Sequence, residues 1–213
     1  PQNPGALDAA LASVSESAAF IASQSSGIAS NYGAYGWQGS LGSLFPGNGY
    51  LLDMDASGVL VYPEFNGLAR LAENKKEVVL SRTIEDWDFN YADYEFIGTI
   101  TASIESHEDS EGDVVAVFVD GECRGIAERI YFPLDDNYYY IVQVYSNADD
   151  ADHEEMTFKY YDKSNDEIVE YSETIEFTNN MVVGDGLNTY SLSRIVKPAP
   201  ERYTLSDAYP NPF

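Results

Sequence analysis

The residues of this chain that are best spaced for chemistry lie in one stretch, DMDASGVLVYPE at 53–64. An EF-hand calcium loop takes oxygen ligands at positions 1, 3, 5 and 12 and a glycine at the sharp turn of position 6. The residues at positions 1, 3, 5, 6 and 12 of this stretch are Asp53, Asp55, Ser57, Gly58 and Glu64. The stretch therefore matches the ligand spacing of a calcium loop.

The flanks of this stretch do not suit an EF-hand, because a helix should lead into the loop and another should leave it. Residues 45–49 read Phe-Pro-Gly-Asn-Gly, which does not form a helix, and Pro63 interrupts the exit. The same residues fit a β-hairpin, with strands at 49–55 and 58–63 joined by a turn at 56–58. We therefore predict the hairpin rather than the EF-hand.

Calcium stays an open alternative at two places. Asp53 and Asp55 can bind it without an EF-hand, since carboxylate oxygens are the ligands that Ca²⁺ prefers. A second acidic cluster follows the strand predicted at 138–146, and its other interpretation is a solvated loop that keeps the sheet soluble. The members of this second cluster are Asp149, Asp150, Asp152, Glu154 and Glu155.

The single cysteine, Cys123, falls within a predicted strand. It has no partner for an internal disulfide, and in a strand it serves as a small buried apolar residue. A catalytic thiol needs a nearby base, but the two histidines, His107 and His153, both lie in acidic loops. The sequence also has no zinc-ligand spacing, no phosphate-binding glycine loop and no Gly-x-Ser-x-Gly elbow. We expect no enzymatic activity and assign no catalytic, cofactor-binding or metal-binding residue.

The charge of the chain restricts its partners. Its 213 residues contain 36 Asp and Glu against 11 Lys and Arg, a net charge of −25. Such a field repels nucleic-acid phosphates and anionic membrane surfaces. No apolar run reaches the roughly 18 residues that a membrane-spanning helix needs. We expect no nucleic-acid partner, no membrane insertion and no cofactor.

The strands that position these residues are organised around the stretch GDVVAVFVDGECRGIAE. Residues 114–119 form an unbroken, mostly β-branched apolar run, which is typical of a strand buried on both faces. Asp-Gly at 120–121 supplies a type I′ turn, which needs φ above zero at both positions. Beyond the turn, alternation predicts that Glu122 points outward, Cys123 inward and Arg124 outward.

These patterns predict a mainly β protein, a β-sandwich preceded by a small α+β unit. Seventeen Tyr and ten Phe favour strands, because aromatic side chains suit pleated, half-buried surfaces. We place the small α+β unit at 1–63, a connector at 64–76, the β-sandwich at 77–195, and a proline-containing linker with a tail at 196–213.

Within the small unit we expect a short amphipathic helix that buries Leu7, Leu11 and Val14. The segment at 167–177 can hold one bent strand or two. The other strands expected in the sandwich, besides the central hairpin, are residues 78–84, 95–106, 138–146, 155–161 and 187–193.

Three aromatic residues in the glycine-rich part of the small unit have two interpretations. Tyr32, Tyr35 and Trp37 can stack on sugar rings, which makes them candidate carbohydrate contacts. They can equally fill a small apolar core, which is the more frequent use of aromatic side chains. We expect the core.

The tail LSDAYPNPF at 205–213 carries the most specific resemblance in the chain. It resembles the first strand of the C-terminal sorting domain of proteins exported by the type IX secretion system of Bacteroidota and related bacteria. That strand reads Leu, two variable residues, Ala or Asn, and then Tyr-Pro-Asn-Pro-Phe. The resemblance covers about nine residues and implies export to the cell surface or beyond; it implies no activity.

The body of the chain resembles an uncharacterised β-domain that recurs in such exported proteins. The matching stretches are TITASI at 99–104, VAVFVDGECRGIAE at 115–128, VYSN at 144–147 and FKYYD at 158–162. The segment at 36–55 resembles a small unit that often precedes this domain.

Together these observations predict a non-enzymatic extracellular or cell-surface structural protein. Our hypothesis for its assembly is that copies exchange a strand or the tail and so form filaments. The alternative function is a calcium-assisted carbohydrate- or surface-binding module of a larger secreted protein. The expected partners are other copies of the chain, with a surface glycan under the alternative.

Overall fold

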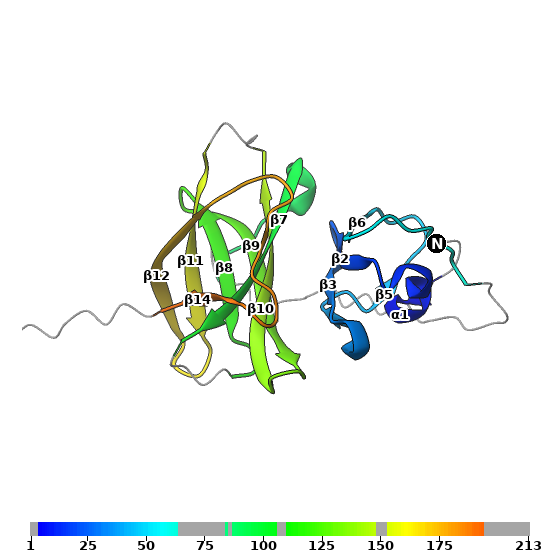
Figure 1. Ribbon diagram of the computed structural model, residues 1–213. Helices are drawn as coiled ribbons and strands as arrows, with labels where there is room; N and C mark the ends of the chain where they lie inside the picture. Colours follow the sequence, from blue (N-terminus) through cyan, green and yellow to red (C-terminus); the bar gives the residue numbers. More distant parts are fainter. Residues whose placement is uncertain (1–3, 64–83, 85–86, 106–109, 148–152, 194–213) are drawn as a thin grey trace, which may run out of the picture.

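The computed structural model is that of a mainly β protein, which confirms the predicted fold class: strands make up 52% of it and helices 8%. A small unit lies beside a larger β-sandwich (Figure 1). The structure describes residues 4–63, 84, 87–105, 110–147 and 153–193. The predicted segments that lie outside these residues are the connector at 64–76, all but the last residue of the strand at 78–84, and the linker and tail at 196–213.

The small unit packs a short helical segment against a four-stranded antiparallel sheet. Its elements are β1 (Gly5–Ala6), α1 (Leu7–Ala10), η1 (Ala12–Val14), β2 (Ala18–Ser23), β3 (Gly27–Asn31), η2 (Gly33–Tyr35), β4 (Trp37–Gly39), β5 (Ser43–Leu44) and β6 (Tyr50–Met54). The sheet has the order β4-β3-β2-β6. The predicted helix is divided between α1 and η1, and its Leu7, Leu11 and Val14 are buried as expected.

The hairpin predicted at 49–63 is wrong in its second half. β6 forms as expected, but residues 58–63 form no strand. β6 pairs antiparallel with β2 instead, because this pairing packs Leu52 and Met54 against the apolar cluster under α1. A hairpin with residues 58–63 would not bury these side chains in that cluster. Residues 58–63 therefore run past η1 without joining a sheet.

The large unit is built on one eight-stranded sheet. Its elements are η3 (Tyr91–Asp93), β7 (Phe96–Ile104), β8 (Val114–Val119), β9 (Glu122–Phe132), β10 (Asn137–Ser146), β11 (Glu155–Asp162), β12 (Glu167–Glu176), β13 (Val182–Val183) and β14 (Tyr190–Leu192). The order is β12-β11-β8-β9-β10-β7-β13, and β14 also pairs with β7. The segment at 167–177 is a single strand, β12, with a bulge in its pairing to β11.

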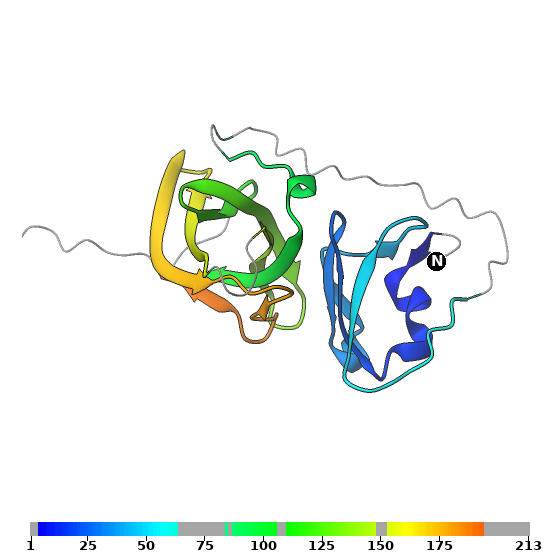
Figure 2. The same cartoon turned by 90° about the horizontal axis from the view of Figure 1, so that it is seen from above.

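The strand β9 carries this sheet from one layer of the sandwich to the other. Residues 122–128 pair with β8, and residues 129–132 pair with β10. No side chain fits at Gly125, since a Cβ there would collide with the carbonyl oxygen of Gln143. The sheet therefore curls into a nearly closed ring around its core (Figure 2). Across that core Tyr140 and Tyr160 meet edge to face, with ring centroids 6.0 Å apart.

The central hairpin of β8 and β9 is confirmed. Every residue of β8 is buried, and the turn has φ of 50° at Asp120 and 83° at Gly121, as a type I′ turn requires. The inner face of β8 lies in the main core. Its outer face is covered by the segment before β7, where Trp87 packs edge to face on Phe118 with ring centroids 5.7 Å apart. This cover explains why the apolar run of β8 has no polar face.

The strand β10 is also covered on both of its faces, with Ile141 and Gln143 of the outer face partly buried. Tyr140, Val142 and Val144 are fully buried in the main core. The side chains between them face the sheet of the small unit, where Ile141 packs against the apolar cluster of β2 and β3. Figure 1 shows β2 and β3 on the side that faces β10, with α1 on the far side of that sheet.

Truncation of Phe118 should be costly, because its ring is 2% exposed and lies between Trp87 and the outer face of the sheet. We expect Phe118→Ala to lower the free energy of unfolding by about 3–5 kcal/mol. Urea unfolding followed by far-UV circular dichroism measures this loss. Ile168→Ala on the exposed face of β12 is the control and should change stability by less than about 0.5 kcal/mol. Equal losses in the two variants would contradict the central position of β8.

Candidate functional site

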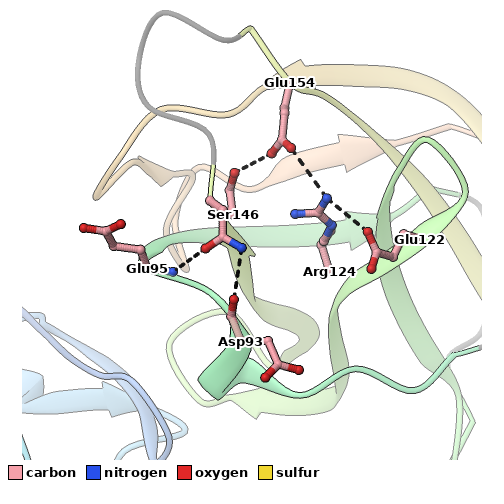
Figure 3. Close-up of polar contacts among 7 residues, drawn as sticks. Asp93, Glu95, Glu122, Arg124, Ser146 and Glu154 are labelled. Atoms are coloured by element: carbon pink, nitrogen blue, oxygen red, sulfur yellow. Dashed lines mark hydrogen bonds and ion pairs between the residues drawn. The ribbon is translucent and has the colours of Figure 1, made fainter.

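A buried arginine of β9 connects β10, the loop before β11 and the turn before β7 (Figure 3). The Nη2 atom of Arg124 lies 3.2 Å from a carboxylate oxygen of Glu122 and 3.5 Å from one of Glu154. The second oxygen of Glu154 accepts a hydrogen bond from Ser146. The guanidinium carbon lies 4.9 Å from the centroid of the Tyr94 ring.

The prediction that Arg124 points outward is wrong, and the cause is a β-bulge. Val117 pairs with Gly125 and Phe118 pairs with Cys123, so Arg124 has no partner on β8. An extra residue in a strand redirects its side chain. The bulge turns Arg124 against Tyr94, where its side chain is only 11% exposed.

The turn that carries Tyr94 is fixed on the same side. The Asn147 side chain accepts a hydrogen bond from the Glu95 backbone N–H (2.8 Å) and donates one to the Asp93 carbonyl (3.0 Å). Asn147 and Arg124 thus hold η3 and the start of β7 against the end of β10. Glu122 and Glu154 form ion pairs with Arg124 and leave its Nε without a hydrogen-bond partner among the described residues. We interpret the cluster as a structural clamp, because its contacts hold neighbouring segments of the large unit together.

The residues considered for nucleophilic chemistry are not brought together. Cys123 is buried in the apolar cluster under Trp87, and burial raises the pKa of its thiol to about 11. His153 is exposed and bonds Glu176, while His107 lies outside the described residues. The expected burial of Cys123 is therefore confirmed.

The candidate calcium ligands are described only in part. Asp53 lies on the exposed face of β6, and Asp55 follows it with its N–H bonded to the Ser17 carbonyl at 2.8 Å. Ser57 is exposed, and Glu64 lies outside the described residues. Within the described ranges no three acidic, His or Cys side chains lie close enough together to hold a metal ion. Of the second acidic cluster, Glu154 belongs to the arginine clamp, Glu155 begins β11, and the three aspartates lie outside those ranges.

An aromatic cleft lies where the two units meet. Residues of β3 and β4 form one wall, and residues of β9 and β10 form the other. Tyr32 packs edge to face on Phe132 with ring centroids 5.1 Å apart, and Phe132 lies 5.7 Å from the Tyr139 ring. Tyr131 stands at the rim with 48% of its surface exposed. The enclosed space of the cleft is only about 20 Å³, because its aromatic rings pack on one another. A ring-sized ligand can therefore contact the exposed aromatic edge but not the buried floor.

Each tyrosine hydroxyl of this cleft lies beside an acidic side chain or a backbone donor. Tyr131 donates to Asp136 at 2.8 Å, and Tyr139 donates to Asp135. Burial, followed by the bond to Asp135, raises the pKa of Tyr139 to about 12. The Tyr32 hydroxyl accepts the Gly186 N–H at 2.7 Å. Burial is the main cause that raises the pKa of Tyr32, and nearby Asp185 adds to it.

The three aromatic residues considered in the sequence, Tyr32, Tyr35 and Trp37, lie in different environments. Trp37 packs against the core of the small unit, as expected. Tyr35 is exposed and Tyr32 enters the cleft, so neither is a core residue. The cleft as a whole was not predicted, because most of its aromatic residues come from β9 and β10. The tyrosine-rich run at 138–140 is the available signal, and its pattern predicts only a strand.

Comparisons with known proteins found no relative of this chain. No model of a protein family, no curated protein and no solved structure matches it. The resemblances to the type IX sorting domain and to an uncharacterised exported β-domain therefore stay predictions. Within the part of the chain that is described, no helix is long and apolar enough to cross a membrane.

Removal of the buried arginine should destabilise the large unit more than removal of its exposed partner. Arg124→Leu leaves the largely buried Glu154 without its cation, and we expect a loss of about 2 kcal/mol in the free energy of unfolding. Glu122→Gln is the matched control, because Glu122 is 64% exposed and an exposed ion pair contributes less than about 1 kcal/mol. Urea unfolding of both variants measures the difference. A control as damaging as Arg124→Leu would show that the clamp does not depend on Glu154.

The thiol of Cys123 should react slowly in the folded protein. A pKa of about 11 in place of 9.0 lowers the thiolate fraction near neutral pH by about a hundredfold, and burial blocks the reagent as well. Reaction with a chromogenic disulfide reagent at pH 8, with and without urea, measures both effects. Rapid labelling without urea would contradict the burial of this residue.

Proposed function

We propose that this chain is a non-enzymatic binding module of an exported protein, and that it binds neutral carbohydrate at the exposed edge of the aromatic cleft between its two units. The observation that supports this function is the composition of the cleft. Its side chains are aromatic, aliphatic or uncharged polar, and neither Lys nor Arg lines it. The tail sequence at 209–213 supports export, although it lies outside the described residues.

The chemistry of the cleft suits a sugar. A pyranose ring has an apolar C–H face, which packs on an aromatic ring, and hydroxyl groups, which need polar partners. Tyr131 offers an exposed ring for the first contact. The carboxylates of Asp135 and Asp136 lie beside it and are strong acceptors for hydroxyl donors.

The charge around the cleft selects the kind of sugar. Asp135, Asp136 and Asp185 all lie near its tyrosines, and the whole chain carries a net charge of −25. Sulfated or uronic-acid glycans are repelled by such a field. We therefore expect uncharged glycans to bind better than anionic ones of similar size.

The structural, self-assembling function that we expected from the sequence has a different basis. It depends on exchange of a strand or tail, and the tail at 196–213 lies outside the described residues. Filament formation by that route stays a prediction. The cleft favours the binding alternative, and its geometry does not require calcium.

A glycan array tests the proposed function. The wild-type chain should retain neutral glycans with and without chelator, and Tyr131→Ala should weaken that binding at least about tenfold. Tyr91→Ala is the matched control, because Tyr91 is 43% exposed but is not among the residues that line the cleft. Equal losses in both variants, or no retained glycan at all, would reject the cleft as a sugar site. Binding that disappears in chelator would favour the calcium-assisted form of the function, with Asp53 and Asp55 as ligand candidates.

A further inference from the structure

The stretch that follows β6 is the most apolar exposed segment among the described residues. Residues 57–63 read Ser-Gly-Val-Leu-Val-Tyr-Pro and are all exposed. Val59 is 77% exposed and Val61 is 61% exposed, and Leu60 and Tyr62 are also among the exposed large apolar residues. β-branched and aromatic residues of this kind favour strands, yet these residues belong to none. An exposed apolar segment of this kind marks an interaction surface.

The hydrogen bonds of Val61 show which side of this segment is free. Its N–H donates to the Ser13 hydroxyl at 2.8 Å, and the same hydroxyl donates to its carbonyl at 3.3 Å. Both polar groups of one residue point to one side in an extended chain, and those of its two neighbours point to the other side. In a strand conformation the backbone groups of Leu60 and Tyr62 are therefore placed on the side away from η1. Pro63 lies two residues after Val61, so its backbone groups are on the side of Val61. Its missing N–H therefore removes no donor from the free side.

We propose that this free side pairs with the same segment of a second copy of the chain, as two antiparallel strands related by a two-fold axis through Val61. Leu60 of one copy then lies opposite Tyr62 of the other, and each such pair exchanges two backbone hydrogen bonds. On the other side of the axis, Tyr62 of the first copy pairs with Leu60 of the second in the same way. Val61 faces its own equivalent as a non-hydrogen-bonded pair.

The local charge permits a second copy as the partner, although the net charge of the whole chain opposes association. Residues 57–63 carry no charged side chain, in a chain whose net charge is −25. Two copies can therefore meet at this segment without placing carboxylates opposite one another. A basic partner would gain nothing here and would be drawn to the acidic surfaces instead. An isologous contact of this kind closes after two subunits, unlike the filaments expected from tail exchange.

The repulsion between two acidic copies gives the dimer a characteristic salt dependence. Screening shortens the range of that repulsion from about 30 Å at 0.01 M salt to about 10 Å at 0.1 M. Sedimentation velocity of the full chain, from about 10 μM to about 1 mM, should show a monomer–dimer equilibrium that shifts toward dimer as salt is added. A strict monomer over this whole range, or open-ended polymers, would overturn the proposal.

Engineered cysteines test the register of the two strands. In Val61→Cys the two thiols face each other across the axis with Cα atoms about 4.5–5.5 Å apart, a separation that a disulfide spans. Val59→Cys is the matched control: it is more exposed, but its two copies lie about 13 Å apart in this register. Cys123 is buried and does not compete.

Mild oxidation followed by non-reducing electrophoresis should link Val61→Cys into dimers at least about tenfold faster than Val59→Cys. Thermal melting of both variants by circular dichroism confirms that each is folded. Equal rates in the two variants, or faster linkage of Val59→Cys, would show random collision and reject the two-fold pairing. The sedimentation result on the unaltered chain decides the proposal if either variant fails to fold.

Discussion

The structure depends on the cover that lies over both faces of β10. Tyr140, Val142 and Val144 fill the core of the curled sheet, and Ile141 packs on β2 and β3 of the small unit. The polar side chains on that outer face are satisfied across the junction: Gln143 and Tyr145 each donate to a backbone carbonyl of the small unit at 2.7 Å. Burial raises the pKa of Tyr145, so it remains a neutral donor there. A strand that is apolar on one face only would leave the small unit without a docking surface.

The cleft follows from this docking. Its walls belong to different units, so it exists only when the sheet of the small unit lies against β9 and β10. Gly125 contributes indirectly, because its missing side chain lets β9 cross close to β10 and bring Tyr131 and Phe132 to the junction. The arginine clamp steadies the opposite end of β10 through Ser146 and Asn147. The cleft is therefore a feature of the junction and not of either unit alone.

Local patterns were sufficient to predict the fold class and the central hairpin, but not the junction. The Asp-Gly turn and the apolar run of β8 depend on a few neighbouring residues, and both are confirmed. Arg124 was predicted to point outward, because the bulge that redirects it depends on pairing with β8. Residues 58–63 were predicted as a strand because their composition suits one; β2 is the partner that β6 takes instead. The cleft combines residues about 100 positions apart, and no sequence period reports such contacts.

The central claim is that the two units are docked through the outer face of β10, and nuclear Overhauser effects test it directly. In a sample with labelled methyl groups, the Ile141 methyl protons should show effects to Ile28 and to the ring of Phe20, as their shared apolar cluster predicts. The contact between Phe158 and Tyr190, whose rings lie 5.4 Å apart inside the large unit, provides the internal reference. Effects at both places would support the docked arrangement. Effects between Phe158 and Tyr190 with none from Ile141 to the small unit would contradict it.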